Sequence, residues 1–205
     1  LALPFQLQDL GYYRMDVAGS IFAVAPWAAD LVHGMAQVIA DAEARGAVNL
    51  MWMLALYAGM WRLGRQLGLP PLLAWTAIAL HCSLPLSSSL LAGMQTELPT
   101  SAVLVGLTLL IGDARTITAR RLASIATLAG LLLAIKVSNA LLLLPLAAWL
   151  LVRSASSMPW KSLPACVMLG TFIALPSYFY AQVIAGNPFL PLLNGVFKSP
   201  YFMLE

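Results

Sequence analysis

The sequence predicts an all-α membrane protein, a polytopic bundle of about six transmembrane helices with one interfacial helix. Hydrophobic residues make up 61% of the 205 residues and charged residues only 9%, and the mean hydropathy is +0.86. Soluble domains usually contain about 45–50% apolar residues. The apolar runs are also too long and continuous for the alternating strands of a barrel, and lipid lets only helices or closed barrels cross it. Because the chain starts at Leu1 without a basic leader, we expect it to be an internal fragment of a longer protein.

Residues 1–46 form the first of three predicted regions, an extracytoplasmic loop that contains the interfacial helix. Over residues 17–40 the apolar residues recur at helical spacing, yet Asp30, His33 and Gln37 share one face. This pattern predicts an amphipathic helix lying in the membrane interface. Asp30 and His33 are either an acid and base pair or part of an ordinary solvated face.

Residues 47–185 form the predicted transmembrane domain, because about 20 apolar residues cross a hydrocarbon core of roughly 30 Å. One long apolar run is interrupted at residues 136–139 by Lys-Val-Ser-Asn. A lysine at the centre of a span costs about 2.5–3.5 kcal/mol, so a helical hairpin that turns here is favoured over one overlong helix. The predicted spans cover residues 47–67, 72–91, 98–112, 122–136, 138–152 and 163–185.

The charged residues orient this topology. If the spans alternate in direction, most cations lie on one face and most acids on the other, and the positive-inside rule makes the basic face cytoplasmic. This bias weakens if residues 122–152 form one span. The basic face holds Arg62, Arg65, Arg115, Arg120, Arg121, Arg153 and Lys161, with Asp113 as its acid.

Two charged residues interrupt the transmembrane domain near its predicted outer surface. Glu97 lies where Gly93 and Pro99 break the helical pattern. It either faces an extracytoplasmic cavity and contacts a polar substrate, or belongs to a solvated loop that caps the next helix. Lys136 either lines the same cavity or extends to the interface from a hairpin tip.

Residues 186–205 form the third predicted region, an extracytoplasmic loop stiffened by proline. Residues 186–202 read GNPFLPLLNGVFKSPYF, and helix is disfavoured before each proline, so we expect an ordered loop. Lys198 is the only cation of this region and either binds a lipid phosphate or anchors the loop at the interface. The aromatic residues suited to the headgroup level are Phe189, Phe197, Tyr201 and Phe202.

The order of these segments carries a resemblance to a known family. The chain opens with LALPFQL, the first predicted span ends with LYAGMWRLGRQLG, and the Glu-bearing break, the interrupted hairpin and the proline-rich loop follow. This order resembles bacterial GT-C glycosyltransferases, which are related in layout to the protein mannosyltransferases and the lipid A aminoarabinose transferase. The closing loop is the most specific part and is similar to the pattern GNPxFPxxNxxFKSPYF. The likeness covers nearly the whole chain loosely and a short part of it well.

The resemblance implies a function and a set of site residues. Such enzymes transfer a sugar from a polyprenyl-phosphate donor to a lipid, glycan or protein acceptor at the outer face of the bacterial inner membrane. The family's acid lies in a D-x-x-x-Y-H motif of the first extracytoplasmic loop; it is expected upstream of Leu1, with Asp9 and Asp16 as substitutes here. Lys198 is expected to stabilise the leaving phosphate. The other residues expected to bind substrate are Glu97, Lys136, Asn187 and Tyr201.

Few cofactors or partners are indicated. Cys82 and Cys166 lie in apolar stretches without His or Cys at ligand spacing, so the sequence suggests neither a disulfide framework nor a zinc site. No cofactor is expected, although a divalent metal stays open. The expected partners are membrane lipids and the lipid-linked sugar, not nucleic acid. Two alternatives remain: a lipid or polysaccharide transporter, whose family usually shows repeats that are not visible here, and a non-catalytic membrane scaffold.

Overall fold

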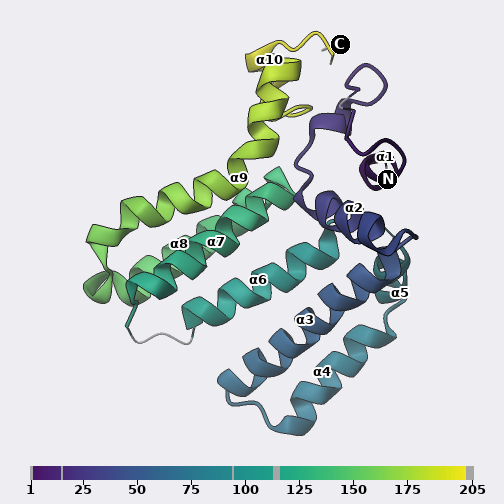
Figure 1. Cartoon of the computed structure of the whole chain (residues 1–205). Helices are drawn as coiled ribbons and strands as arrows, with labels where there is room; N and C mark the ends of the chain where they lie inside the picture. The colour runs from purple at the N-terminus through teal and green to yellow at the C-terminus, as the bar shows by residue number, and fades with distance from the viewer. Residues whose placement is uncertain (1, 15, 94, 113–115, 202–205) are drawn as a thin grey trace.

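The computed structural model describes residues 2–14, 16–93, 95–112 and 116–201, and all regular structure in these residues is helical (Figure 1). The all-α prediction is therefore confirmed for this part of the chain. The helices, in order, are α1 (Ala2–Leu10), α2 (Ala28–Ala40), α3 (Arg45–Gln66), α4 (Pro71–Ser83), α5 (Pro85–Ala92), α6 (Glu97–Gly112), α7 (Ala119–Ile135), α8 (Ala140–Ser154), α9 (Leu163–Ala185) and α10 (Asn194–Phe197). Short 3-10 turns add η1 (Ile21–Val24), η2 (Val137–Asn139), η3 (Ala155–Ser157) and η4 (Trp160–Ser162).

The long helices lie side by side with alternating direction (Figure 1). Helix α7 packs between α6 and α9, and α3 packs on the far side of α6. The main core lies among α6, α7 and α8 and includes the fully buried side chains of Leu107, Ile111 and Leu132. These apolar contacts hold α6 and α7 together up to the end of the bundle where Ile135 is buried.

Helices α7 and α9 approach closely through glycine. A methyl group on Gly130 would overlap the carbonyl group of Gly170, and one on Gly170 would come within 2.8 Å of the Ala126 carbonyl oxygen. Small residues at such a crossing let two backbones touch, which is how helices associate where lipid removes the hydrophobic driving force. This contact fixes α9 against α7.

Two helical segments are long and apolar enough to cross a membrane within the described residues, Val137–Ser157 and Trp160–Ala185. Helices α4 and α5 form a third only if they are taken together, because they meet at an angle of 66°. Six transmembrane helices are thus not confirmed. The span predicted over residues 72–91 is divided into two helices, since Leu84 adopts an extended conformation before Pro85.

The hairpin predicted at residues 136–139 is confirmed. Helix α7 ends at Ile135, and α8 begins after η2. The buried Asn139 side chain holds this turn, because its Nδ2 donates to the Leu132 carbonyl at 2.9 Å and to Thr100 Oγ1 at 3.1 Å. Lys136 therefore occupies a fixed turn between two helices.

The helix that was predicted to lie in the interface is shorter than predicted and buries a different face. It begins at Ala28 rather than near residue 17, because a turn, η1 and Pro26 come first. His33 and Gln37 are buried, and Gln37 Nε2 donates to Gln8 of α1. The solvated-face interpretation is therefore wrong for these two residues. The exposed side of α2 is instead apolar and carries Met35, Val38 and Ile39.

The end of helix α9 packs against the N-terminal segment. It contains Pro176 and changes direction along its length (Figure 1). Its last turns pack Ala181 and Ala185 against Val17 and Val24 of the N-terminal segment and against Leu190. Two parts of the chain that are distant in sequence, the N-terminal segment and the end of α9 with the loop after it, thus meet at one end of the bundle.

Candidate functional site

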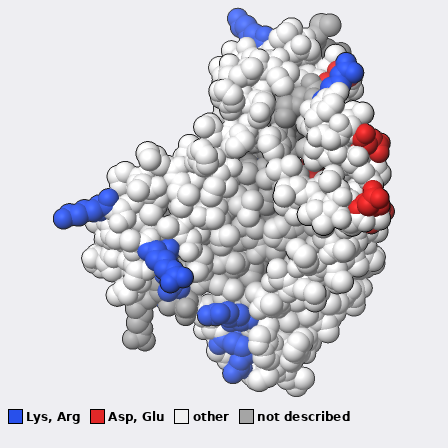
Figure 2. All heavy atoms as spheres, viewed as in Figure 1, with Lys and Arg blue, Asp and Glu red and all other residues white. Residues whose placement is uncertain are grey.

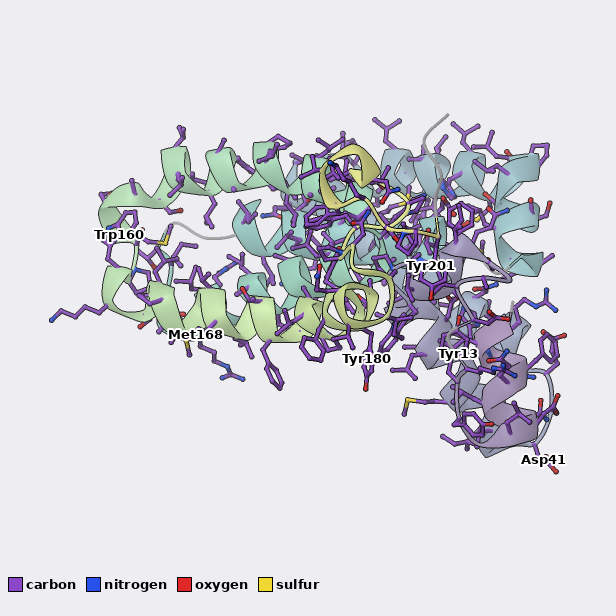
Figure 3. All side chains as sticks on the ribbon, turned by 90° about the horizontal axis from the view of Figure 1, so that it is seen from above. Tyr13, Asp41, Trp160, Met168, Tyr180 and Tyr201 are labelled. Atoms are coloured by element: carbon purple, nitrogen blue, oxygen red, sulfur yellow. The ribbon has the colours of Figure 1, made fainter. Side chains whose placement is uncertain are left out.

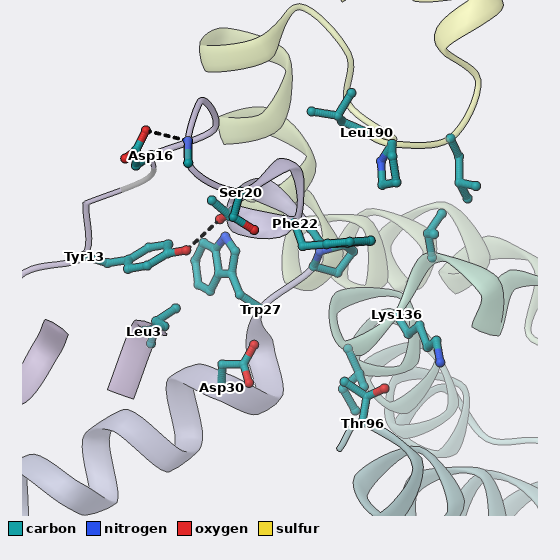
Figure 4. A pocket seen from close by; sticks show the side chains of 18 of the residues that line it. Leu3, Tyr13, Asp16, Ser20, Phe22, Trp27, Asp30, Thr96, Lys136 and Leu190 are labelled. Carbon is teal, nitrogen blue, oxygen red and sulfur yellow. Dashed lines mark hydrogen bonds between the residues drawn. The ribbon is translucent and has the colours of Figure 1, made fainter. Parts of the chain in front are cut away.

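A cavity of about 690 Å³ lies where these segments meet, and the space-filling view shows a hollow there (Figures 2 and 4). Its walls come from the segment of residues 13–27, the first turn of α2, the turn at residues 135–138 and the loop at residues 190–192. Charged side chains from three of these walls line the cavity: Lys136 from the hairpin, Asp30 from α2, and Arg14 with Asp16 from the segment of residues 13–27. In Figure 4 Lys136 and Asp30 lie on opposite sides, with Phe22 between them.

On the hairpin wall, Lys136 forms an ion pair. Its Nζ donates to Glu97 Oε1 at 3.0 Å, and both side chains are about half exposed, at 47% and 50%. Partial burial raises the pKa of Glu97, but the hydrogen bond and the charge of Lys136 outweigh it, so the pKa of this carboxyl lies below its usual value. The wall therefore carries a paired cation that water and a ligand can reach.

On the opposite wall, the charged residue is Asp30. It is partly buried in the first turn of α2, and among the described residues no Lys or Arg pairs with it. Burial raises the pKa of Asp30 above its usual value. A partly buried carboxylate with a raised pKa is suited to accept a proton from a substrate hydroxyl.

Tyr13 shapes the wall next to Asp30. Its hydroxyl donates to the Ala23 carbonyl at 2.9 Å, which holds the segment of residues 13–27 in a closed loop (Figure 4). Burial raises the pKa of Tyr13, and the negative charge of Asp30 raises it further. Asp30 is thus close enough to Tyr13 for its charge to act on the phenol.

The two acids expected to substitute for the family's acid differ in position. Asp16 is exposed and lines the cavity, and its Oδ1 accepts a hydrogen bond from the Gly19 amide at 3.1 Å. Asp9 is exposed on α1 and does not line the cavity. Arg14, which the sequence did not single out, is exposed and lines the cavity beside Asp16.

The other expected substrate-binding residues lie outside this cavity. Asn187 is fully buried, where its Nδ2 donates to the Leu192 carbonyl at 2.9 Å and its Oδ1 accepts from the Phe189 amide. Lys198 is exposed, with a positive φ of 53°, and Tyr201 is also exposed. The loop contributes Leu190, Pro191 and Leu192 to the cavity instead. Phe202, Arg115 and Asp113 lie outside the described residues.

Asp30 is the site residue whose position the sequence indicated least. The pattern paired it with His33, but His33 is buried away from the cavity. Burial lowers the pKa of His33, and the charge of Arg45 lowers it further. The available signal was an acid that interrupts an apolar helical stretch, and this signal does not reveal which neighbour the acid faces.

No metal site is visible in the described part of the chain, where no three His, Cys, Asp or Glu side chains are grouped to hold an ion. Comparison with known proteins gives no further guide, because the chain matches no protein-family model, no curated protein and no solved structure.

Proposed function

We propose that the protein is a GT-C-type membrane glycosyltransferase that moves a sugar from a polyprenyl-phosphate donor to an acceptor hydroxyl. The observation that carries this proposal is one cavity with a reachable cation, Lys136, on one wall and, on the opposite wall, a carboxylate, Asp30, that no described Lys or Arg pairs. Transfer from a lipid phosphate needs a cation for the leaving phosphate and a base for the acceptor. The two apolar helices that could cross a membrane suit a donor with a long hydrocarbon tail.

The proposed step uses both walls. The acceptor oxygen forms a bond to the anomeric carbon of the sugar while the bond from that carbon to the phosphate oxygen breaks. The acceptor proton passes to the Asp30 carboxylate. The leaving polyprenyl phosphate keeps the electron pair, and Lys136 stabilises its added negative charge, as an ammonium does at developing charge.

The charge distribution supports an extracytoplasmic site. The cavity lies at the end of the bundle where α6 begins and α7 ends. Cations gather at the other end, with Arg120 and Arg121 in the first turn of α7 and Arg65 and Arg153 in the last turns of α3 and α8. In Figure 2 the acids gather at the upper right together with a few cations, whereas the lower left end shows cations alone. By the positive-inside rule the cavity end is outside.

We include the shorter helices as membrane passes in this proposal. Helix α7 has 17 residues, and at 1.5 Å per residue such a helix is about 25 Å long, close to the thickness of a hydrocarbon core. The proposed membrane passes are α3, α4–α5, α6, α7, α8 and α9. With these six passes the chain alternates in direction, so that most cations lie on one face of the membrane.

Sugar transfer by a variant of Asp30 tests the function. The full-length protein is reconstituted in liposomes with undecaprenyl-phosphate-linked hexoses and pentoses, and release of undecaprenyl phosphate is measured. Asp30→Asn is expected to slow release by roughly 100- to 10,000-fold, because general base catalysis is lost. Retention of undecaprenyl phosphate in native mass spectrometry should be unchanged.

Asp41→Asn is the matched control. Asp41 is exposed at the end of α2 with a φ of 49°, a conformation that asparagine tolerates. This variant should retain transfer. Full activity in Asp30→Asn, or an equal loss in both variants, contradicts the proposal. A loss in Asp16→Asn alone would assign the base to the rim of the cavity.

A further inference from the structure

A second cavity adjoins the first and has a different character. It measures about 500 Å³ and shares the side chains of Leu3, Tyr13 and Trp27 with the first cavity. The rest of its lining is Leu7, Leu31, Tyr180 and Ile184. All of these side chains are apolar or aromatic, so the second cavity suits a hydrocarbon chain rather than a sugar or a phosphate.

The second cavity borders a helix that is apolar enough to cross a membrane. Tyr180 and Ile184 belong to the last turns of the segment Trp160–Ala185. Figure 3 shows Tyr180 and Tyr13 toward the same end of the molecule, away from Trp160 and Met168. Val183, in the same turns of α9, is exposed. A lipid chain in the outer leaflet can therefore reach this cavity along α9.

The second cavity adjoins the wall of the first cavity that carries Asp30, the proposed general base. Leu31, which lines the second cavity, directly follows Asp30 in α2. In Figure 4, Asp30, Leu3, Tyr13 and Trp27 lie together on one side, whereas Lys136 and Thr96 lie on the other. A molecule that extends from the second cavity into the first therefore meets the base before it meets the cation.

We propose that the acceptor is a lipid with a hydroxyl-bearing headgroup, whose hydrocarbon chain occupies the second cavity while its hydroxyl reaches Asp30. This inference rests on the proposed function, in which Asp30 takes the acceptor proton and Lys136 holds the donor phosphate. Because the donor phosphate is bound on the opposite wall, the donor tail leaves the site on the hairpin side. The acceptor is then neither a protein nor a free glycan.

Photo-crosslinking tests this assignment. The full-length protein is placed in nanodiscs that contain phosphatidylglycerol with a diazirine in one acyl chain, because this lipid carries headgroup hydroxyls. After irradiation, adducts are mapped by peptide mass spectrometry. We expect adducts at the residues that line only the second cavity, and excess undecaprenyl phosphate should not reduce them.

Matched tryptophan variants separate the cavity from the surrounding lipid. Leu31→Trp fills the second cavity and should lower adducts on α1 and α9 there by about tenfold, since the indole ring would clash with the acyl chain of the lipid. Met35→Trp adds the same ring one turn further along α2, where the side chain is exposed, and should leave adducts unchanged. Leu7→Trp blocks the cavity from α1 and should match Leu31→Trp. Retention of undecaprenyl phosphate reports that each variant is folded.

Each other outcome is decisive. If undecaprenyl phosphate displaces the adducts, the second cavity holds the donor tail and the inference is overturned. If no adducts form in the cavity while undecaprenyl phosphate binding still depends on Lys136, the lipid acceptor is rejected and the proposed function stands. If Asp30→Asn transfers sugar normally, the proposed function itself fails, whatever the crosslinks show.

Discussion

Two carboxylates at the end of the bundle have opposite properties although their helical positions match. Asp30 lies in the first turn of α2 and Glu97 in the first turn of α6. Each carboxylate is therefore close to the positive end of a helix dipole, which favours negative charge. Yet burial raises the pKa of Asp30, whereas Lys136 outweighs burial at Glu97 and lowers the pKa there.

The difference shows that the partner, and not the helix end, decides what each carboxylate does. Glu97 keeps its charge because a cation lies 3.0 Å away. Asp30 has no such partner among the described residues, so its charged form is costly and it is suited to take up a proton. Glu97 itself does not line the cavity, so it acts there only through Lys136.

Among the variants that test this comparison, the largest effect on undecaprenyl phosphate binding is expected when Lys136, the partner of Glu97, is replaced. Lys136→Ala should weaken retention of undecaprenyl phosphate by roughly 10- to 100-fold, because a charge-assisted hydrogen bond contributes about 1.5–3 kcal/mol. Native mass spectrometry of the full-length protein, titrated with the lipid, measures this. Lys161→Ala, an exposed cation in η4 at the opposite end, is the control and should change affinity by no more than about twofold.

Lys198→Ala distinguishes Lys136 from Lys198, the residue that the sequence favoured, as the cation that binds the phosphate. Lys198 lies outside the cavity, so the structure favours Lys136 as the phosphate-binding residue. A loss of undecaprenyl phosphate in Lys198→Ala, with normal retention in Lys136→Ala, would move the phosphate site to the proline-rich loop.

A smaller effect is expected when the partner of Lys136 is neutralised. Glu97→Gln removes a negative charge that competes with the phosphate for the ammonium group. A partly exposed ion pair contributes about 0.2–1 kcal/mol, so undecaprenyl phosphate should bind roughly two- to fivefold more tightly. Weaker binding in the same titration would show that Glu97 is needed to hold Lys136 in position.

The smallest effect is on stability, and its sign should differ between the two carboxylates. A raised folded-state pKa favours folding below the unfolded pKa, and this contribution is lost as pH rises through the folded pKa. Asp30→Asn should therefore raise the melting temperature at neutral pH but not at acidic pH. The pKa of Glu97 is lowered, so its contribution is present above the unfolded pKa and is lost as pH falls through the folded pKa.

Thermal unfolding in detergent across this pH range measures both effects. Glu97→Gln should lower the melting temperature slightly at neutral pH, because the pair is half exposed and contributes about 1 kcal/mol at most. Shifts of the same sign in the two variants would contradict the opposite environments of Asp30 and Glu97.

Several local features were accessible from sequence. The hairpin at residues 136–139 was predicted because a cation and an amide interrupt an apolar run, and the structure has this turn. The bend at Leu84 was missed, although Pro85 was the available signal. The start of α2 was placed too early, because apolar spacing continues through η1 and does not distinguish a 3-10 turn from a helix.

The candidate site was only partly accessible. Glu97 and Lys136 were each suspected, but their ion pair joins the start of α6 to the end of α7, and no local pattern reports such a contact. Lys198 was favoured because its loop is rich in proline and aromatic residues. That local order is present, with Asn187 buried inside the loop, yet Lys198 does not line the cavity.

The sequence by itself determined the helical class, the apolar segments, the hairpin turn and the separation of cations from acids along the chain. These properties depend on hydropathy and on residues a few positions apart. Only the tertiary structure decided that Asp30 and Lys136 share a cavity and that an apolar cavity adjoins it. The physical reason is that the walls come from α2, the hairpin and the loop after α9, whose approach is set by packing such as the glycine contact between α7 and α9.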